Sequence, residues 1–210
     1  MLPGMHASPE PTGMKTVIGS RQAGFLFFLG IILVVPGGDG AHALEKGARA
    51  PGFCLSVLDE AETASSRYCL DERVGETAVK PAAAVVVSFF AMWCGVCKQQ
   101  LPALQTLRQR YAERGLEIVV IGVDKVPREE VRTYLRGAGI TLPVVKDVFS
   151  VLMQRYEVSE LPVAFLLDRR GVLVERFLGF DHAIEQRMVT TLERVLPLPG
   201  GTDRRKEGKP

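Results

Sequence analysis

Two cysteines two residues apart follow a long apolar run, and this junction constrains the fold more than any other feature. The motif W-C-G-V-C-K occupies residues 93–98, directly after the apolar stretch 82–90. A short, β-branched apolar run of this kind is typical of a central strand covered on both faces. Apolar residues then recur at steps of three and four, which predicts a helix over 96–114. The chain therefore carries a dithiol between a buried strand and a helix.

The remaining pattern predicts alternating strands and helices. The helix at 96–114 contains Pro102, which should kink it, and stops at Gly115. Further expected elements are an N-terminal hairpin (53–58 with 67–70), a buried strand (116–123), a helix (127–136), an extended piece (142–145), a short helix (149–156), an antiparallel strand pair (163–167 and 172–178) and a last helix (181–196). This order predicts an α/β fold with a mixed central sheet and helices on both faces.

Residues 1–43 are interpreted as a secretory signal peptide. A basic start precedes the 13-residue apolar stretch 23–35, and A-H-A, ending at Ala43, is a typical cleavage site. Cleavage there would release a soluble periplasmic protein that begins at Leu44. A membrane span needs about 20 apolar residues, so an uncleaved anchor is the second interpretation. The true start of the signal is possibly Met14, because Met14-Lys15 opens a more typical leader.

The mature chain is expected to form one domain over 44–198, followed by a disordered tail at 199–210 that is rich in Gly, Pro and charge. The chain carries 26 basic and 24 acidic residues, a net charge of +2. A phosphate-binding face needs clustered Lys and Arg, so we expect no nucleic-acid partner. We also expect no cofactor. In an exported protein disulfides can persist, so every cysteine has a possible redox role.

The position of the dithiol assigns a different role to each cysteine. A thiolate attacks a disulfide and a thiol does not. Cys94 begins the helix, where unpaired N–H groups and the helix dipole stabilise negative charge, so it is the predicted nucleophile. Cys97 lies one turn further in and is the predicted resolving thiol. Together Cys94 and Cys97 are the predicted redox-active disulfide.

A metal site or a static disulfide would be the other use of such a pair. A four-cysteine zinc site needs a second close pair, but fourteen residues separate Cys54 from Cys69. The two-cysteine, two-histidine type fails as well, since His182 is the only histidine after residue 43. We therefore expect no metal site and assign His182 no role.

Several motifs occur in the order found in one known family. They are A-P-G-F at 50–53, V-S-F-F-A-M-W-C-G-V-C at 87–97, Pro102 within the helix, and E-L-P-V-A-F-L-L-D at 160–168. Over about residues 50–196 the chain resembles the thioredoxin superfamily, specifically the exported TlpA/ResA-like thiol-disulfide oxidoreductases, which also resemble the cytochrome c maturation reductases. The resemblance implies a thioredoxin fold with an added N-terminal β-hairpin.

The resemblance also implies roles for two further residues. Pro162 matches a cis-proline that faces the dithiol and positions the substrate through the backbone of residue 161; an ordinary trans proline at a strand start is the alternative. Trp93 matches an exposed face that docks partner proteins, whereas a lone tryptophan is more often partly core.

Two positions depart from the family pattern beneath the dithiol. The chain has Gln100 where the relatives usually have an acid, and Ser88 where they have Asn or Asp. Neither side chain titrates in the range that proton transfer needs. The usual proton relay is therefore absent, or it is replaced by Lys98, Glu157 or water. A further alternative is that the reaction does not need such a relay.

Cys54 and Cys69 lie on the two predicted hairpin strands. A structural disulfide that staples the hairpin is the first interpretation, a second redox pair and two buried free thiols being the others.

The predicted function is an exported thiol-disulfide oxidoreductase that reduces protein disulfides, for example in apocytochrome c or a copper-site assembly protein. The family expectation for its electron donor is a membrane dithiol transporter. A thiol peroxidase is an alternative, although residues 87–94 lack the Pro and Thr of the peroxidatic motif. A copper chaperone is another, although it needs C-x-x-x-C and a distal histidine. The direction of electron transfer, the reduction potential, the substrate and the oligomeric state are open.

Overall fold

Strand β3 (Ala84–Phe90) is the centre of the fold because water reaches none of its side chains. All seven of its residues are buried. It pairs in parallel with β4 (Leu116–Gly122) on one side and antiparallel with β6 (Val163–Asp168) on the other. A strand with neighbours on both edges and apolar layers on both faces can carry an almost wholly apolar sequence.

The computed structural model describes residues 44–58 and 67–199. Two predicted segments lie outside the described residues. They are the signal peptide, with its cleavage site and Met14, and the tail from residue 200 onward. The elements in chain order are β1 (Cys54–Ser56), β2 (Arg67–Cys69), η1 (Leu70–Glu72), β3 (Ala84–Phe90), α1 (Gly95–Tyr111), η2 (Ala112–Arg114), β4 (Leu116–Gly122), α2 (Arg128–Gly137), β5 (Val144–Lys146), α3 (Val151–Arg155), β6 (Val163–Asp168), β7 (Leu173–Leu178) and α4 (His182–Val195).

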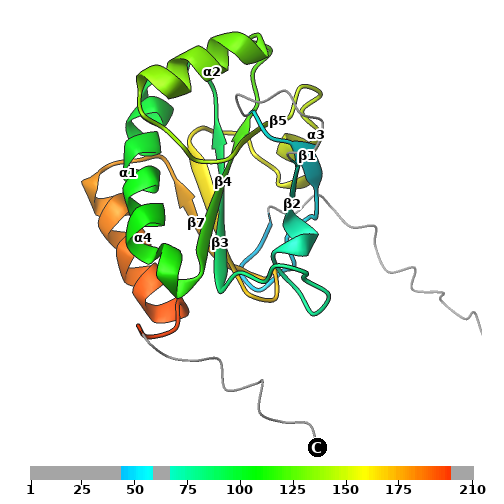
Figure 1. Cartoon of the computed structure of the whole chain (residues 1–210), viewed down its shortest axis with the longest axis vertical. Helices are drawn as coiled ribbons and strands as arrows, with labels where there is room; N and C mark the ends of the chain where they lie inside the picture. Colours follow the sequence, from blue (N-terminus) through cyan, green and yellow to red (C-terminus); the bar gives the residue numbers. More distant parts are fainter. Residues whose placement is uncertain (1–43, 59–66, 200–210) are drawn as a thin grey trace, which may run out of the picture. The chain divides into compact units, whose positions relative to one another are not determined.

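Within the described ranges the main sheet has the strand order β5-β4-β3-β6-β7. The strands β3, β4 and β5 run parallel, whereas β6 and β7 run antiparallel to their neighbours. Figure 1 shows β3 and β4 in the middle of this sheet, with α1 and α4 lying along one side of it. The predicted mixed sheet of a thioredoxin-like α/β fold is confirmed.

The two faces of the sheet are covered by different layers. Ala84, Val86 and Phe90 of β3 belong to an apolar cluster that includes buried residues of α1, α2 and α4. On the opposite face, the Phe89 ring lies 5.4 Å from the Tyr156 ring, which follows α3, in a second cluster that also holds the N-terminal segment. Helices therefore lie on both faces, but the three longest pack on the same one.

The N-terminal hairpin closes the open edge of β5. Strands β1 and β2 pair antiparallel, with Cys54 opposite Cys69, and these two cysteines form a disulfide. Just beyond β1, the N–H of Leu58 donates to the carbonyl of Val144 at 2.7 Å, and Val57 forms a bridge with Val145. The predicted hairpin is thus present and packs at the edge of the main sheet.

Helix ends agree with local capping chemistry. The carboxylate of Asp181 accepts the N–H of Ile184 at 2.8 Å and begins α4, as its position predicts. Asp147 does the same for α3, since its carboxylate accepts the N–H groups of Val151, Leu152 and Met153. This capping explains why α3 begins at Val151, two residues later than the predicted helix.

A buried ion pair joins the parallel strands where they end. The side chains of Asp124, just after β4, and Lys146, at the end of β5, are 4% and 3% exposed, and Lys146 Nζ lies 2.9 Å from Asp124 Oδ1. Asp124 also accepts the backbone N–H groups of Met92 and Val126. The pair therefore ties the loop that follows β3 to the ends of β4 and β5.

Replacing Cys54 and Cys69 together by serine should lower the free energy of unfolding of the oxidised protein by about 3 kcal/mol, because a loop of this length is freed in the unfolded chain. Urea denaturation followed by circular dichroism measures the loss. An unchanged midpoint would show that the bond adds nothing to stability.

Asp124→Ala should lower the free energy of unfolding by about 3–5 kcal/mol, since it leaves the Lys146 ammonium buried without a carboxylate. Lys146→Met should cost less, because Asp124 retains the two backbone donors. Urea denaturation of both variants tests this order, and the reverse order would contradict the view that Asp124 holds the loop.

Candidate redox site

The two cysteines of the C-x-x-C motif are joined as a disulfide at the start of α1. Cys94 is the N-cap residue, with an extended backbone, and its sulfur accepts the N–H of Cys97 at 3.1 Å. Their Cα atoms are 5.2 Å apart, within the usual range for disulfides. The N–H of Cys94 donates to the carbonyl of Ala91 at 3.1 Å, so a tight turn leads from β3 into the helix.

The exposure of the motif differs from residue to residue. Cys97 is 1% exposed and Cys94 is 7% exposed, so the nucleophile proposed from sequence is the more accessible of the two cysteines. Beside it, the side chain of Trp93 is 73% exposed and Val96 is 41% exposed. Trp93 is therefore a surface residue next to the disulfide and contributes little to the core.

Pro162 lies at the same edge of the sheet as the disulfide. It precedes β6, whose first residue, Val163, is opposite Phe89 near the end of β3. The Leu161-Pro162 peptide bond is cis, and the carbonyl of Pro162 accepts the N–H of Gly179 at 2.8 Å.

Ser88 and Gln100 form one hydrogen-bonded pair beneath the helix start. Ser88 Oγ donates to Gln100 Oε1 at 2.9 Å, and both residues are fully buried. Gln100 lies three residues after Cys97, on the same face of α1. Within the described residues its Nε2 has no hydrogen-bond partner. The position where relatives were expected to carry an acid thus holds a neutral, buried amide.

The two ionisable substitutes considered from sequence lie in different surroundings. Lys98 Nζ is 5.0 Å from the centre of the Tyr134 ring of α2. Glu157 follows Tyr156 with a positive φ of 50°. Among the hydrogen bonds of the described residues, none joins either side chain to Cys94 or Cys97. Neither side chain is therefore hydrogen-bonded to either cysteine of the disulfide.

Sequence reasoning missed the support that holds the motif in place. Asp124 binds the N–H of Met92, one residue before Trp93, and is itself paired with Lys146. A signal for this pair was present, because each charged residue ends or follows a short apolar stretch of strand. Pairing them required the parallel register of β4 and β5.

An exposed apolar segment follows β5, at the same edge of the sheet as the disulfide. Phe149 is 84% exposed, with Val148 and Val151 beside it also exposed. The carboxyl ends of parallel strands meet at one edge, so this segment and Trp93 both lie beyond the ends of β3 to β5. Sequence reasoning placed Phe149 and Val151 in a helix over 149–156 and missed the exposure of the segment.

Metal binding finds no additional support in the described part of the chain. Within residues 44–58 and 67–199, no group of three or more His, Cys, Asp or Glu side chains is arranged to hold a metal ion. His182 is exposed at the start of α4 and contacts Gln186. In the same ranges, none of the helices is both long and apolar enough to cross a membrane.

Curated relatives of the chain are thiol-disulfide oxidoreductases. The chain is 24% identical over 182 residues to thiol-disulfide oxidoreductase ResA of Bacillus thuringiensis (strain Al Hakam), covering 82% of this chain and 96% of the relative. It is 27% identical over 140 residues to ResA of Bacillus subtilis (strain 168), covering 67% of this chain and 71% of that protein.

Solved structures with a similar fold carry related names. A proposed thiol:disulfide interchange protein DsbE from Chlorobium tepidum superposes with a TM-score of 0.63 at 24% identity, over 73% of this chain and 99% of the other. The pneumococcal exposed lipoprotein thioredoxin Etrx1 superposes with a TM-score of 0.55 at 21% identity, over 69% of this chain and 99% of the other. At these identities the two structures support the fold alone.

The sequence profile of the AhpC/TSA family matches residues 47–176, which include the hairpin cysteines, the C-x-x-C motif and Pro162. Together with the ResA relatives, this match confirms the predicted enzyme class, a thioredoxin-like thiol-disulfide oxidoreductase. The chain therefore belongs to the AhpC/TSA family, and its curated relatives are thiol-disulfide oxidoreductases of the ResA type.

Proposed function

We propose that the protein reduces disulfide bonds in exported proteins, with Cys94 as the nucleophile and Cys97 as the resolving thiol. The observation that carries the proposal is the disulfide at the N-terminus of α1, in which Cys94 is the N-cap and the more exposed partner. A thiolate released at this position gains the favourable potential of the helix start and the N–H of Cys97.

The reaction consumes one dithiol and one substrate disulfide. The Cys94 thiolate attacks a substrate sulfur, the substrate S–S bond breaks, and the departing thiolate takes a proton from water. Cys97 then gives its proton to water, and its thiolate attacks the Cys94 sulfur, so that the bond from Cys94 to the substrate breaks. This second exchange releases the other substrate thiol and leaves the Cys94–Cys97 disulfide, so two electrons pass to the substrate. A dithiol donor, proposed to be a membrane protein, reduces the disulfide again.

Three features around the disulfide suit an extended protein substrate. Pro162 and the backbone of Leu161 directly precede β6 at this edge, where a substrate strand could pair with the chain. Trp93 adds an exposed aromatic surface, and Phe149 adds another beyond β5. Exposed aromatic residues of this kind are enriched at protein interfaces.

Export is part of the proposal and is supported by the sequence of residues 1–43. Apocytochrome c or a copper-site assembly protein is the proposed substrate class, since both carry paired cysteines that must be reduced before they bind a metal or haem. A relative in structure, Etrx1, is described as an exposed lipoprotein. Cleavage near Ala43 and retention of the leader as an uncleaved anchor predict different masses for the mature chain.

Cys97→Ser should accumulate a covalent adduct between Cys94 and the substrate, because the resolving thiol is missing. Cys94→Ser should abolish both the adduct and insulin reduction. Non-reducing electrophoresis followed by mass spectrometry identifies the adduct, and insulin turbidity measures reduction.

If Cys94→Ser retains insulin reduction, the assigned roles are wrong. Peroxide consumption by the reduced protein at rates far above free cysteine would favour the peroxidase alternative. Stoichiometric tight copper binding would favour the chaperone alternative. The double variant Cys54→Ser/Cys69→Ser is the matched control and should reduce insulin at the wild-type rate.

Gln100→Glu should change the pH dependence of the second exchange. In the wild-type protein neither Ser88 nor Gln100 can take the proton of Cys97, so the resolution rate should follow a single titration. A buried glutamate has a raised pKa and adds a base beside Cys97, which should speed resolution at lower pH and add a second inflection. Stopped-flow release of a fluorescent mixed disulfide measures both profiles, with Gln99→Glu on the exposed face as control. Identical profiles would contradict a role for this position.

A further inference from the structure

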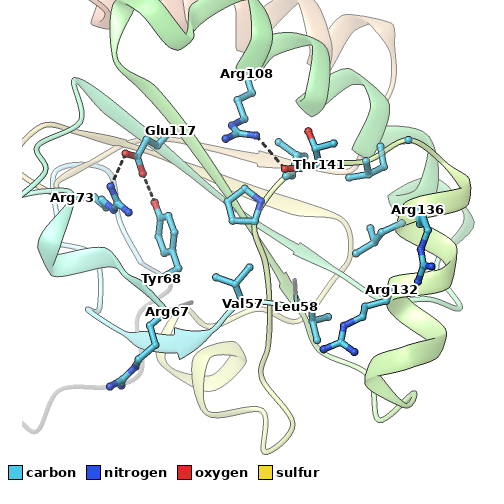
Figure 2. Close-up of a pocket in the computed structure, with 15 residues that line it drawn as sticks. Val57, Leu58, Arg67, Tyr68, Arg73, Arg108, Glu117, Arg132, Arg136 and Thr141 are labelled. Carbon is cyan, nitrogen blue, oxygen red and sulfur yellow. Dashed lines mark hydrogen bonds and ion pairs between the residues drawn. The ribbon is translucent and has the colours of Figure 1, made fainter. Parts of the chain in front are cut away.

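A cavity of about 800 Å³ lies away from the disulfide. Its walls come from the end of the β1 segment, β2, the start of β4, α1, α2 and the loop 139–143. Figure 2 shows these elements around the cavity, with Arg108 of α1 and Arg132 of α2 on different sides. None of the residues discussed above as the redox site lines it. A volume of this size is typical of a site for a small molecule.

The cavity is rich in arginine. Among the lining residues the only carboxylate is Glu117, whereas guanidinium groups come from β2, the loop after η1, α1 and α2. The arginines are Arg67, Arg73, Arg108, Arg132 and Arg136. Arg73 is paired with Glu117, and Arg132 and Arg136 are paired with Glu129 of α2. The charges in the lining that lack a carboxylate partner among the described residues are therefore those of Arg67 and Arg108.

The Glu117 carboxylate already has hydrogen-bond partners at one side of the cavity. Its carboxylate accepts Arg73 Nη1 at 3.1 Å and the Tyr68 hydroxyl at 3.3 Å, as Figure 2 shows. Burial, and then the charge of Glu117, raise the pKa of Tyr68, so the phenol stays neutral and donates. Arg73 also lies 5.5 Å from the Tyr68 ring centre, and its Nε is buried without a partner in the described residues.

Two of the arginines have no carboxylate partner in the part of the chain that the structure describes. Arg108 Nη1 donates to the carbonyl of Thr141 at 3.1 Å, which leaves its charge unneutralised. Arg67 forms no ion pair with a described residue. A guanidinium offers several N–H donors in a planar fork, so both can bind an oxyanion in addition to their present contacts.

Most of the other side chains that line the cavity are apolar. Val57, Leu58, Ile140, Leu142 and Pro143 contribute side chains between the arginines. Figure 2 places Val57 and Leu58 at the side opposite Arg108. An inorganic ion would leave this apolar surface uncovered, whereas a ligand with a hydrocarbon body would bury it and gain binding free energy from the hydrophobic effect.

We propose that this cavity binds a small organic oxyanion, a molecule with an apolar body and at least one phosphate or carboxylate group. The oxyanion would lie against Arg67 and Arg108, where unneutralised guanidinium groups can form charge-assisted, bidentate hydrogen bonds. The apolar body would lie against the Val57, Leu58 and Pro143 side chains. The site is independent of the proposed redox function, since the two share no lining residue.

Isothermal titration calorimetry of the full-length oxidised protein with three probes tests this proposal. Phenyl phosphate should bind at least tenfold more tightly than inorganic phosphate, and benzyl alcohol should not bind measurably. The affinity for phenyl phosphate should fall several-fold as NaCl rises from about 20 to about 300 mM, because the contacts are ionic. No binding of phenyl phosphate, or equal affinity for inorganic phosphate, would overturn the proposal.

Variants locate the binding. Arg67→Gln and Arg108→Gln should each weaken phenyl phosphate at least tenfold, and both are surface changes that leave the core untouched. Arg170→Gln, on the exposed turn after β6 and outside the cavity, is the matched control and should bind like wild type. Equal affinity in all three variants would place the ligand elsewhere. Insulin reduction should be unchanged in all three, so a failure here is distinguishable from a failure of the redox proposal.

Discussion

Burial of β3 on both faces is the constraint on which the rest of the structure depends. Its seven residues cannot meet water, so α1, α2 and α4 must cover one face and the N-terminal segment with α3 the other. The chain leaves this strand at Phe90 and turns directly into α1. The disulfide therefore stands where a rigid strand meets a helix N-terminus, and its position is fixed by the core rather than by a loop.

Two pairs of polar side chains are buried near that junction, and each pair holds neighbouring elements together. Asp124 and Lys146 neutralise each other and hold the N–H of Met92, so the loop before Trp93 is tied to two further strands. The Ser88 hydroxyl donates to Gln100 Oε1 between β3 and α1 without introducing a charge, while Gln100 Nε2 has no hydrogen-bond partner among the described residues. A neutral pair stabilises the packing of the helix, while it removes the proton acceptor that an acid would supply beside Cys97.

The two ends of the domain have contrasting surfaces. Beyond the carboxyl ends of the parallel strands, Trp93 and Phe149 expose aromatic rings around the disulfide, a surface suited to protein chains. At the start of β4, arginines surround a cavity with an apolar base. Thiol exchange needs access for a protein, whereas the arginine-lined cavity has the volume of a small-molecule site, so the fold can separate the two kinds of recognition.

The sequence by itself determined the elements, the hairpin and the dithiol at the helix start, because periodicity, caps and cysteine spacing are local properties. It also pointed to Pro162 and Trp93 through the order of motifs. The tertiary structure alone decided the pairing of Asp124 with Lys146, the exposure of Phe149 and the convergence of arginines such as Arg67 and Arg108. These depend on strand register and on contacts between elements that are far apart in the chain, and no local pattern encodes which distant side chains will lie together.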